Sequence, residues 1–401
     1  MKMVSALRLL GLGAAMTVLV SCGGVGDLAG GVGSGGSGVA EGTVTGFGSV
    51  YIDGERYDDR AAAVTEDGPS GTRTAILKLG QRVRLQSTGN NVAESIQVLT
   101  ELIGPIERID NDGAALLLTV LGQSVRVERA VAGVSGAVTW VDFGDAPCAP
   151  DCNFAINQWV QAHGSWVMGP DAGYFLLASR IEVVEPQTKV LLSGVVREVS
   201  GGVVRMNAVS GTRVEIDNVA QAPAVSVDQV LRVWAPPPVG AQPVRAERAV
   251  PAPLTEGASA SRAVLGGEVS RVSNDGAEIE IQGTRIAVPA ELRGKVTAQQ
   301  FARIEMERGP AGGWVLKAPP KVPTSIERAE VQLRETITVL QLRQAALGNW
   351  RLRDTLLRRT ALSGECAAFL DQPIATRVRV SVQATRGPLP MSVRDINCTG
   401  E

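Results

Sequence analysis

The stretch V-L-G-G-E-V-S-R-V-S-N-D-G-A-E-I-E-I, residues 264–281, decides the fold class of this chain. Apolar and polar residues alternate on both sides of the S-N-D-G segment at 273–276, as they do in two half-buried β-strands. Asn, Asp and Gly readily adopt the positive φ angles of a tight hairpin turn. The stretch therefore predicts a β-hairpin.

Degenerate copies of this hairpin recur along the chain. The opening strand is repeated at 102–109 and 191–199, and each copy ends in a turn, at 110–113 and 200–202. A strand with the pattern Gln, apolar, x, apolar comes next, at 79–85, 157–162, 227–233 and 299–306. A closing strand ends each unit, at 93–98, 177–183, 244–249 and 314–317. A unit of so few strands is expected to close into a small barrel of OB type, which leaves no strand edge open.

The composition favours an all-β chain with several cores. The 401 residues include 46 glycines and only 4% aromatic residues, and alternating runs replace long helical periods. About 360 residues follow the Gly-rich N-terminal segment, which is more than a single core holds. We therefore predict a tandem array of OB-like β-barrel modules at 42–101, 102–187, 188–252, 261–323 and 324–401. The linkers at 185–188 and 249–260 are expected to separate independently folded pieces.

The last module is ambiguous between helix and strand over residues 325–347. Apolar residues recur at helical spacing through this stretch, but some of them also alternate as in a strand: Val331, Leu333, Ile337 and Val339. We interpret the stretch as strand. The expected strands of this fifth module are 333–340, 349–353, 376–382 and 391–396.

Module 1 carries G-T-V-T-G-F-G-S-V-Y-I-D-G at 42–54, followed by L-G-Q-R-V at 79–83 and A-E-S-I at 93–96. These segments resemble an uncharacterised repeat family of proteobacterial lipoproteins, a domain of unknown function. The resemblance covers 42–99 and, more weakly, 100–323. It implies a small β-barrel module and transfers no catalytic residue. Modules 2 to 4 lack the G-F-G-S-V segment, so a function of that hairpin would belong to module 1 alone.

The N-terminus has the order of a bacterial lipoprotein signal. Lys2 and Arg8 precede an uncharged run at 9–20, which is too short to span a bilayer but has the length of a signal-peptide core. L-V-S-C at 19–22 resembles a lipobox, which implies cleavage before Cys22 and acylation of its sulfur. An ordinary secretory signal with an incidental cysteine is the alternative. We predict a signal peptide at 1–21 and a Gly-rich tether at 22–41.

This anchor implies a location and a membrane contact. Such lipoproteins are commonly retained at the inner membrane when Asp follows the cysteine, whereas Gly23 stands here. We therefore expect an outer-membrane lipoprotein that faces the periplasm or the cell surface. The membrane contact would be made through the N-terminal lipid.

The remaining cysteines form an even set of four: Cys148, Cys152, Cys366 and Cys398. An exported protein meets an oxidising compartment, so we expect both pairs to be disulfides. Cys148 and Cys152 could instead form a redox or metal motif, but three residues rather than two separate them. A structural clip on a loop is the preferred interpretation.

The sequence offers little for catalysis or metal binding. His163 is the single histidine and lies in no recognisable motif, so we expect a solvent-facing strand histidine. The D-N-D-G segment at 110–113 opens like a calcium loop, but Leu121 stands where a bidentate Glu is required. We expect a hairpin turn there, as at Asp53 and Gly54. Metal sites and cofactors are not predicted.

Aromatic residues are concentrated in module 2, around the segment from Cys148 to Cys152. One interpretation is that this module uses larger core residues to cover a long loop. The other is an aromatic-lined binding face, because rings offer a large contact area at low entropic cost. Its candidate residues are Trp140, Phe143, Phe154, Trp159, Trp166 and Tyr174.

The net charge bears on the class of partner. It is −2 for the whole chain and −4 once Lys2 and Arg8 are removed, which argues against general nucleic-acid binding. We expect a lipid-anchored envelope protein of non-enzymatic type, with a structural role or a role in binding an envelope protein or glycan. One alternative is an envelope enzyme that acts on glycans or peptides through carboxylates. The other is an OB-type nucleic-acid binder, although the arginines at 351–359 have only Trp350 nearby.

Overall fold

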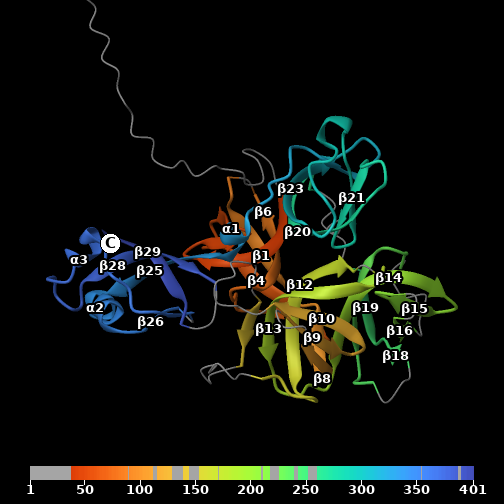
Figure 1. The fold of residues 1–401 in the computed structure, drawn as a ribbon, viewed down its shortest axis with the longest axis horizontal. Coiled ribbons are helices and arrows are strands. Elements are labelled where there is room, and N and C mark those ends of the chain that lie inside the picture. The colour runs from red at the N-terminus through yellow and green to blue at the C-terminus, as the bar shows by residue number, and fades with distance from the viewer. Residues whose placement is uncertain are drawn as a thin grey trace, which may run out of the picture. The chain divides into compact units, whose positions relative to one another are not determined.

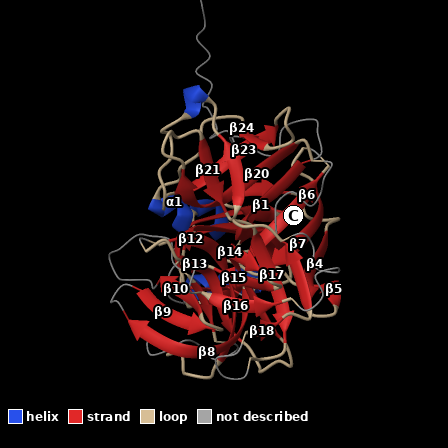
Figure 2. Ribbon diagram, turned by 90° about the vertical axis from the view of Figure 1, so that its right-hand side faces the viewer, coloured by secondary structure: helices blue, strands red, loops and turns tan. Residues whose placement is uncertain are grey.

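The computed structural model describes residues 38–88, 90–111, 115–128, 139–143, 153–169, 171–208, 211–216, 225–238, 243–251, 260–353, 355–386 and 390–401. The chain divides into the units Met1–Gly30 and Gly31–Glu401, and the described residues belong to the second. Figure 1 labels their elements, and Figure 2 shows that strands far outnumber helices. The predicted all-β fold class with OB-like modules is confirmed.

Module 4 shows the barrel most clearly. Its strands are β20 (Arg262–Val272), β21 (Glu278–Ile281), β22 (Thr284–Ala287), β23 (Phe301–Arg308) and β24 (Trp314–Leu316). Hydrogen bonds join them in the closed order β20-β21-β22-β24-β23 and back to β20. β22 and β24 pair in parallel, and the 3₁₀ helix η1 (Ala290–Leu292) precedes β23. This is the Greek-key order of an OB barrel, and β20 with β21 is the hairpin expected at 264–281.

Module 2 repeats this order with β8 (Leu102–Asn111), β9 (Ala115–Val120), β10 (Gln123–Glu128), β12 (Trp159–Met168) and β13 (Tyr174–Val183). β10 and β13 form its parallel pair, and β11 (Trp140–Asp142) adds to the other part of β13. β8 and β9 pair as the hairpin expected around 110–113. The module is therefore a second closed barrel.

Module 3 divides its closing strand into two pieces. Its elements are β14 (Val190–Ser200), β15 (Val203–Met206), β16 (Thr212–Glu215), β17 (Val230–Ala235), β18 (Val244–Arg245) and β19 (Arg248–Pro251). β18 pairs in parallel with β16, and β19 pairs with β17. Residues 249–251 were expected in a linker, but they belong to β19 and pair with β17. The barrel therefore extends to Pro251.

Module 1 consists of β1 (Gly38–Phe47), β2 (Val50–Ile52), β3 (Glu55–Tyr57), β4 (Ala63–Gly68), β5 (Gly71–Thr74), β6 (Arg82–Ser87) and β7 (Ala93–Leu99). β1 pairs with β2 and β6, and β7 pairs with β6 and in parallel with β4. The tether predicted at 22–41 ends earlier, because β1 begins at Gly38. Val39 and Ala40 are buried, and the backbone around them pairs on both sides.

Module 5 departs from the other barrels between its first two strands. β25 (Glu330–Thr338) leads into helix α2 (Val339–Leu347), and β26 (Trp350–Leu352) and β27 (Thr355–Leu357) then form a separate two-stranded sheet. Helix α3 (Gly364–Ala367) precedes β28 (Arg377–Thr385), which pairs with β25 and with β29 (Ser392–Gly400). The predicted later strands are present in this order.

The prediction of strand throughout 325–347 was wrong at both ends. Helix α1 (Ser325–Ala329) precedes β25, and α2 follows it. Both helices begin with a capping box: Thr324 and Glu327 bond reciprocally, as do Thr338 and Gln341. A capping box satisfies the first free N–H groups of a helix, and here it prevails over the alternation of apolar residues.

The Gln of the repeated Gln-apolar pattern holds the same turn in four modules. Its side-chain oxygen accepts a hydrogen bond from the N–H three residues earlier, at 2.8 Å for Gln81, 3.1 Å for Gln158, 3.2 Å for Gln229 and 3.1 Å for Gln300. We call these the pre-strand-4 turns: residues 78–81, 155–158, 226–229 and 297–300. The repeats recognised in the sequence are therefore repeats of one local structure.

The modules are joined through their first strands. β1 pairs in parallel with β20 at Gly38–Glu41, and with β25 at Gly46 and Phe47. β8 pairs with β14. The hydrophobic cores largely follow these pairings. One core is shared by modules 1 and 5 and also takes in Trp140 of module 2 and Val264 of module 4. A second is shared by modules 2 and 3, and module 4 has its own, joined by Val39.

Candidate functional site

The G-F-G-S-V segment of module 1 is a strand-docking site. It ends β1 and begins the turn to β2, and module 5 lies directly against it through β25. A Cβ on Gly46 would stand 2.2 Å from the carbonyl oxygen of Gln332, and one on Gly48 would stand 2.2 Å from Cβ of Arg334. Gly48 also has φ +101°, which favours glycine. The two glycines therefore let the backbone of β25 approach closely.

Two aromatic residues of this hairpin make cation–π contacts with arginines of module 5. The guanidinium of Arg353 lies 4.8 Å from the ring centroid of Phe47, and that of Arg334 lies 5.9 Å from the ring centroid of Tyr51. Both rings are buried. Such cation–π contacts are worth about 0.5–2 kcal/mol each. They explain why the segment occurs in module 1 alone, since module 1 is the barrel that takes β25.

We call a second feature the polar junction: the buried charged residues Glu41, Arg82, Glu101 and Arg232 with their partners. Arg82, 1% exposed, bonds Glu41 of its own module at 2.9 Å and donates to the carbonyl of Gly266 in module 4 at 3.0 Å. It also donates to Ser165 of module 2 at 3.3 Å. One buried guanidinium thus contacts three modules.

Glu101 makes the equivalent link among modules 1, 2 and 3. It lies between β7 and β8. Its Oε1 forms an ion pair with Nη2 of Arg232 in β17, at 2.6 Å. Ser193 of β14 donates to its other oxygen, and the indole N–H of Trp166 donates to Ser193 at 3.0 Å. A buried charge pair of this kind is costly to break, because the remaining partner stays buried and unpaired. The two residues between β7 and β8, which join modules 1 and 2, are therefore held in place.

The pKa values of the buried carboxyls in this region depend on the balance between burial and nearby arginines. Burial raises the pKa of Glu41, but the charges of Arg84 and Arg82 outweigh it and hold the pKa below its ordinary value. For Asp53 the balance is reversed: burial dominates and its pKa is raised. Its Oδ2 occupies the space where a Cβ of Gly42 or of Gly266 would stand, at 2.0 and 1.8 Å.

Asp53 belongs to a group of carboxyls from three modules, which we call the carboxyl cluster: Asp53, Glu128 and Glu268. Burial raises the pKa of all three, and the charges of Glu128 and Asp53 add to this effect at Glu268. Arg328 of α1 bonds Glu268 at 2.7 Å. Buried carboxyls with raised pKa values are candidates for acid–base chemistry, so this cluster is the candidate for such a role.

Sequence reasoning missed the polar junction and the carboxyl cluster. A signal was present: Arg232 interrupts the apolar run of 230–235, and every residue of that strand is buried. A charge within a fully apolar strand requires a buried partner. The identity of that partner, Glu101, depends on which modules meet and has no local signature.

His163 is not the solvent-facing residue we expected. It lies in β12 and is fully buried, with Nδ1 2.9 Å from the carbonyl oxygen of Leu99 and Nε2 3.3 Å from the side chain of Gln161. Burial lowers its pKa to about 4. The error arose because β12 is covered by residues 99–101, the end of β7 and the two residues after it, a contact between modules that strand alternation does not reveal.

The six aromatic candidates do not form an exposed face. Trp140, Phe154, Trp166 and Tyr174 are buried, and Phe143 and Trp159 are half-buried. Phe143 and Phe154 stack with centroids 4.9 Å apart, and the hydroxyl of Tyr174 donates to Glu280 of module 4 at 3.1 Å. Their placement corresponds to the interpretation as large core residues, and the exposed recognition face is withdrawn.

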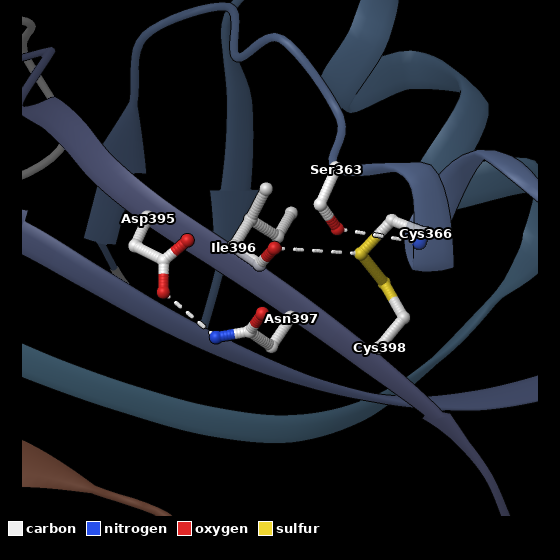
Figure 3. The surroundings of a disulfide bond; sticks show 6 residues. All are labelled: Ser363, Cys366, Asp395, Ile396, Asn397 and Cys398. Atoms are coloured by element: carbon white, nitrogen blue, oxygen red, sulfur yellow. Dashed lines mark hydrogen bonds between the residues drawn. A yellow bond between two sulfur atoms is a disulfide. The ribbon is translucent and has the colours of Figure 1, made fainter.

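Only one of the two predicted cysteine pairs lies within the described residues. Cys366 of α3 and Cys398 of β29 form a disulfide in the structure, with Cα atoms 4.9 Å apart. Figure 3 shows this bond beside Ser363, whose Oγ accepts a hydrogen bond from Cys366 N. Cys22, Cys148 and Cys152 lie outside the described residues. Their lipidation and pairing stay predictions.

Comparisons with known proteins add little. No family model matches this chain, and no curated protein matches it. A solved structure from Streptococcus pneumoniae, a multidomain protein with nucleic acid binding domains, is similar over 67% of this chain and 86% of its own, at 9% identity and a TM-score of 0.15. A likeness this weak carries no argument.

Two further features are absent from the residues that the structure describes. No group of three or more His, Cys, Asp or Glu side chains there could hold a metal ion. No helix in the same part of the chain is long and apolar enough to cross a membrane.

Proposed function

We propose that this chain is a lipid-anchored envelope protein of non-enzymatic type, whose OB-like modules form a fused array for structural support or for binding an envelope protein or glycan. The observation that carries the proposal is the use of buried groups between modules. Arg82 and Glu101 each contact three modules, and the G-F-G-S-V segment is occupied by module 5. Groups that could bind a ligand are used to join modules.

The anchor rests on the sequence. Residues 2–22 have the order of a lipoprotein signal, with Cys22 as the acylated residue and the outer membrane as the location, facing the periplasm or the cell surface. The resemblance of 42–99 to a lipoprotein repeat family supports the same proposal. The partner would then be another component of the envelope.

The anchor is tested by metabolic labelling with a palmitate analogue, followed by membrane fractionation. The wild type is expected to carry the label and to sediment with the outer membrane. Cys22→Ala should remain unlabelled and unprocessed, and label on that variant would refute the anchor. Cys366→Ala with Cys398→Ala serves as the control, because it removes two cysteines elsewhere, leaves no unpaired partner of that disulfide, and should leave labelling unchanged.

Binding is tested by capture of partners from envelope extracts with the full chain. Gly48→Val should disturb the contact with module 5 and alter what is captured if the fused array is the binding form. Gly54→Val also changes a glycine with positive φ, but no atom lies within 4 Å of the new Cβ. Identical capture by both variants would show that the array is not required.

An envelope enzyme acting on glycans or peptides is the second candidate, and the carboxyl cluster is the observation in its favour. Hydrolysis of envelope glycans and peptides by the purified chain would be compared with that of Asp53→Asn and Glu268→Gln. Loss of a measurable activity in both variants, with folding retained, would support the enzyme. Activity that is absent from the wild type, or equal in all three proteins, would reject it.

A further inference from the structure

The residue that directly follows the second strand of each module has the same backbone conformation in all five. We call it the post-strand-2 residue. Its φ is positive, between +47° and +67°, at each of these positions: Asp53, Leu121, Asn207, Gln282 and Arg353. Asn and Asp adopt this left-handed conformation readily, whereas it costs free energy for Leu, Gln and Arg. The turn by itself therefore does not explain which side chain each module carries there.

In module 4 this residue is bonded to module 2. The side-chain oxygen of Gln282 accepts a hydrogen bond from Trp166 N at 2.8 Å, and its Nε2 donates to the carbonyl of Gly164 at 2.9 Å. Both backbone groups lie on the edge of β12 that faces away from β13, and β8 pairs with this edge only at Trp159–Ala162. The amide of Gln282 thus takes the place of a partner strand.

Module 3 also inserts its post-strand-2 residue into module 2. Nδ2 of Asn207 donates to Oε1 of Gln123, and the backbone carbonyl of Asn207 accepts from Tyr174 N at 2.7 Å. Its Oδ1 accepts from Val195 N, in the first strand of its own barrel, at 2.8 Å. Asn207 is buried. One side chain therefore links the first strand of module 3 to module 2.

Modules 1 and 5 place the same residue against two further barrels. Oδ2 of Asp53 lies against Gly266 of module 4, where an added Cβ would stand 1.8 Å from it. The guanidinium of Arg353 lies over the ring of Phe47 in module 1, 4.8 Å from its centroid. In four modules, therefore, the side chain of the post-strand-2 residue meets another barrel.

Leu121 of module 2 is the exception. Its Cγ lies 2.8 Å from the place of an added Cβ on Gly104, in the first strand of its own barrel. Its contact with Thr212 of module 3 is made by the backbone carbonyl, at 3.3 Å. Module 2 is also the barrel that accepts both Asn207 and Gln282. The side chains that reach another barrel are polar or charged, whereas the one that stays within its own barrel is apolar.

We propose that the side chain of the post-strand-2 residue determines which barrel a module docks against, with module 2 as the acceptor for modules 3 and 4. The partner is another barrel of the same chain. Each side chain matches the groups that it meets, as an amide matches an open strand edge and an arginine matches an aromatic ring. The inference rests on the fused array of the proposed function, but not on the lipid anchor or on a ligand.

The test replaces the residue by asparagine, which suits the turn better but the docking contact worse. Gln282→Asn is one methylene shorter and should not reach both backbone groups, so the amide hydrogen of Trp166 should exchange about tenfold faster. Arg353→Asn loses the contact with Phe47, so the amides of β25 around Gln332 and Leu333 should exchange about threefold faster.

Ala172→Asn is the matched control. Ala172 also has a positive φ, +59°, but it is exposed in the turn between β12 and β13. This variant should leave the exchange rates at Trp166 and in β25 at their wild-type values. Circular dichroism on every variant ensures that faster exchange is not lost folding.

The two docking variants also control each other, because their residues dock with different barrels. Each should speed exchange at its own contact and leave the other contact unchanged. Rates equal to those of the control would overturn the inference, and so would a variant that speeds exchange equally at both contacts. In either case the fused array survives if Trp166 is protected in the wild type. An unprotected Trp166 amide in the wild type would overturn the array as well.

Discussion

Modules 4 and 5 have their strands in the same order along the chain, but only module 4 has strand pairing around the whole barrel. In module 4, strand pairing runs around the whole barrel and its core residues, such as Leu265 and Ile304, form a cluster almost entirely of their own. In module 5, α2 separates β25 from β26, and Val331 and Leu333 pack into a core shared with module 1. One repeat can thus be stabilised from within or by its neighbour.

The largest expected difference concerns isolated fragments. Residues 261–323 contain all five strands of module 4 and should fold alone, giving a β-rich circular dichroism spectrum and protected amides. Residues 324–401 should lack protection, because their core is completed by module 1. Module 4 also pairs with β1 through Gly38–Glu41, so hydrogen exchange will show whether β20 needs that edge. A protected 324–401 fragment would contradict the comparison.

Removal of the disulfide should have the next largest effect. Cys366 and Cys398 enclose a separation of 32 residues, and loop-closure entropy assigns such a link about 3 to 4 kcal/mol. Cys366→Ala with Cys398→Ala should lower the unfolding free energy of module 5 by that amount in urea. The same change should leave hydrogen exchange in 262–316 unaltered, since module 4 contains no cysteine. Equal loss of protection in both modules would mean that they unfold together.

Acid should destabilise the barrel of module 2 more than module 5. The chain has a single histidine, His163, and it is buried in module 2. The pKa of His163 is lowered by burial to about 4, against an ordinary 6.5, so the folded state favours neutral imidazole. This stabilisation is complete above pH 6.5 and is lost as the pH falls toward 4. Between pH 6.5 and 4.5 the loss is about 2 to 3 kcal/mol.

The groups facing His163 are Glu182, which raises its pKa, and Arg180 and Lys78, which lower it. Urea unfolding at a series of pH values should show the loss in the wild type. His163→Gln should remove this loss of about 2 to 3 kcal/mol. The smaller slope that remains near pH 4.5 comes from carboxyls such as Glu182, whose pKa is lowered to about 2 in the folded state from an ordinary 4.5. A wild-type profile that is already flat from pH 6.5 to 4.5 would show that the imidazole is accessible to water.

The sequence was sufficient for the barrels but not for the contacts between them. Alternation and turn residues are local signals, so the hairpin at 264–281 and the strand after each repeated Gln were predictable. The Gln itself was expected within that strand, but in the structure it holds the turn before it, and the strands begin at Arg82, Trp159, Val230 and Phe301. The burial of His163 depends on residues about 60 positions away, at Leu99. The aromatic residues of module 2 were ambiguous for the same reason, because Tyr174 contacts Glu280 in another module. Interfaces between repeats leave no periodic pattern.

The smallest effect, and the most direct probe of docking, is expected at Gly48. Its φ of +101° resembles the +82° of Gly54, so alanine strains the backbone at both positions. Only at Gly48 does the new Cβ meet another module, at Arg334, which should cost about 2 kcal/mol more than at Gly54. That extra cost should appear in β25 and β28, whose amides exchange faster, while β20 and β23 remain protected. If Gly48→Ala and Gly54→Ala lose the same stability and module 5 stays protected, then module 5 does not depend on this docking site, and the contrast with module 4 rests on the disulfide alone.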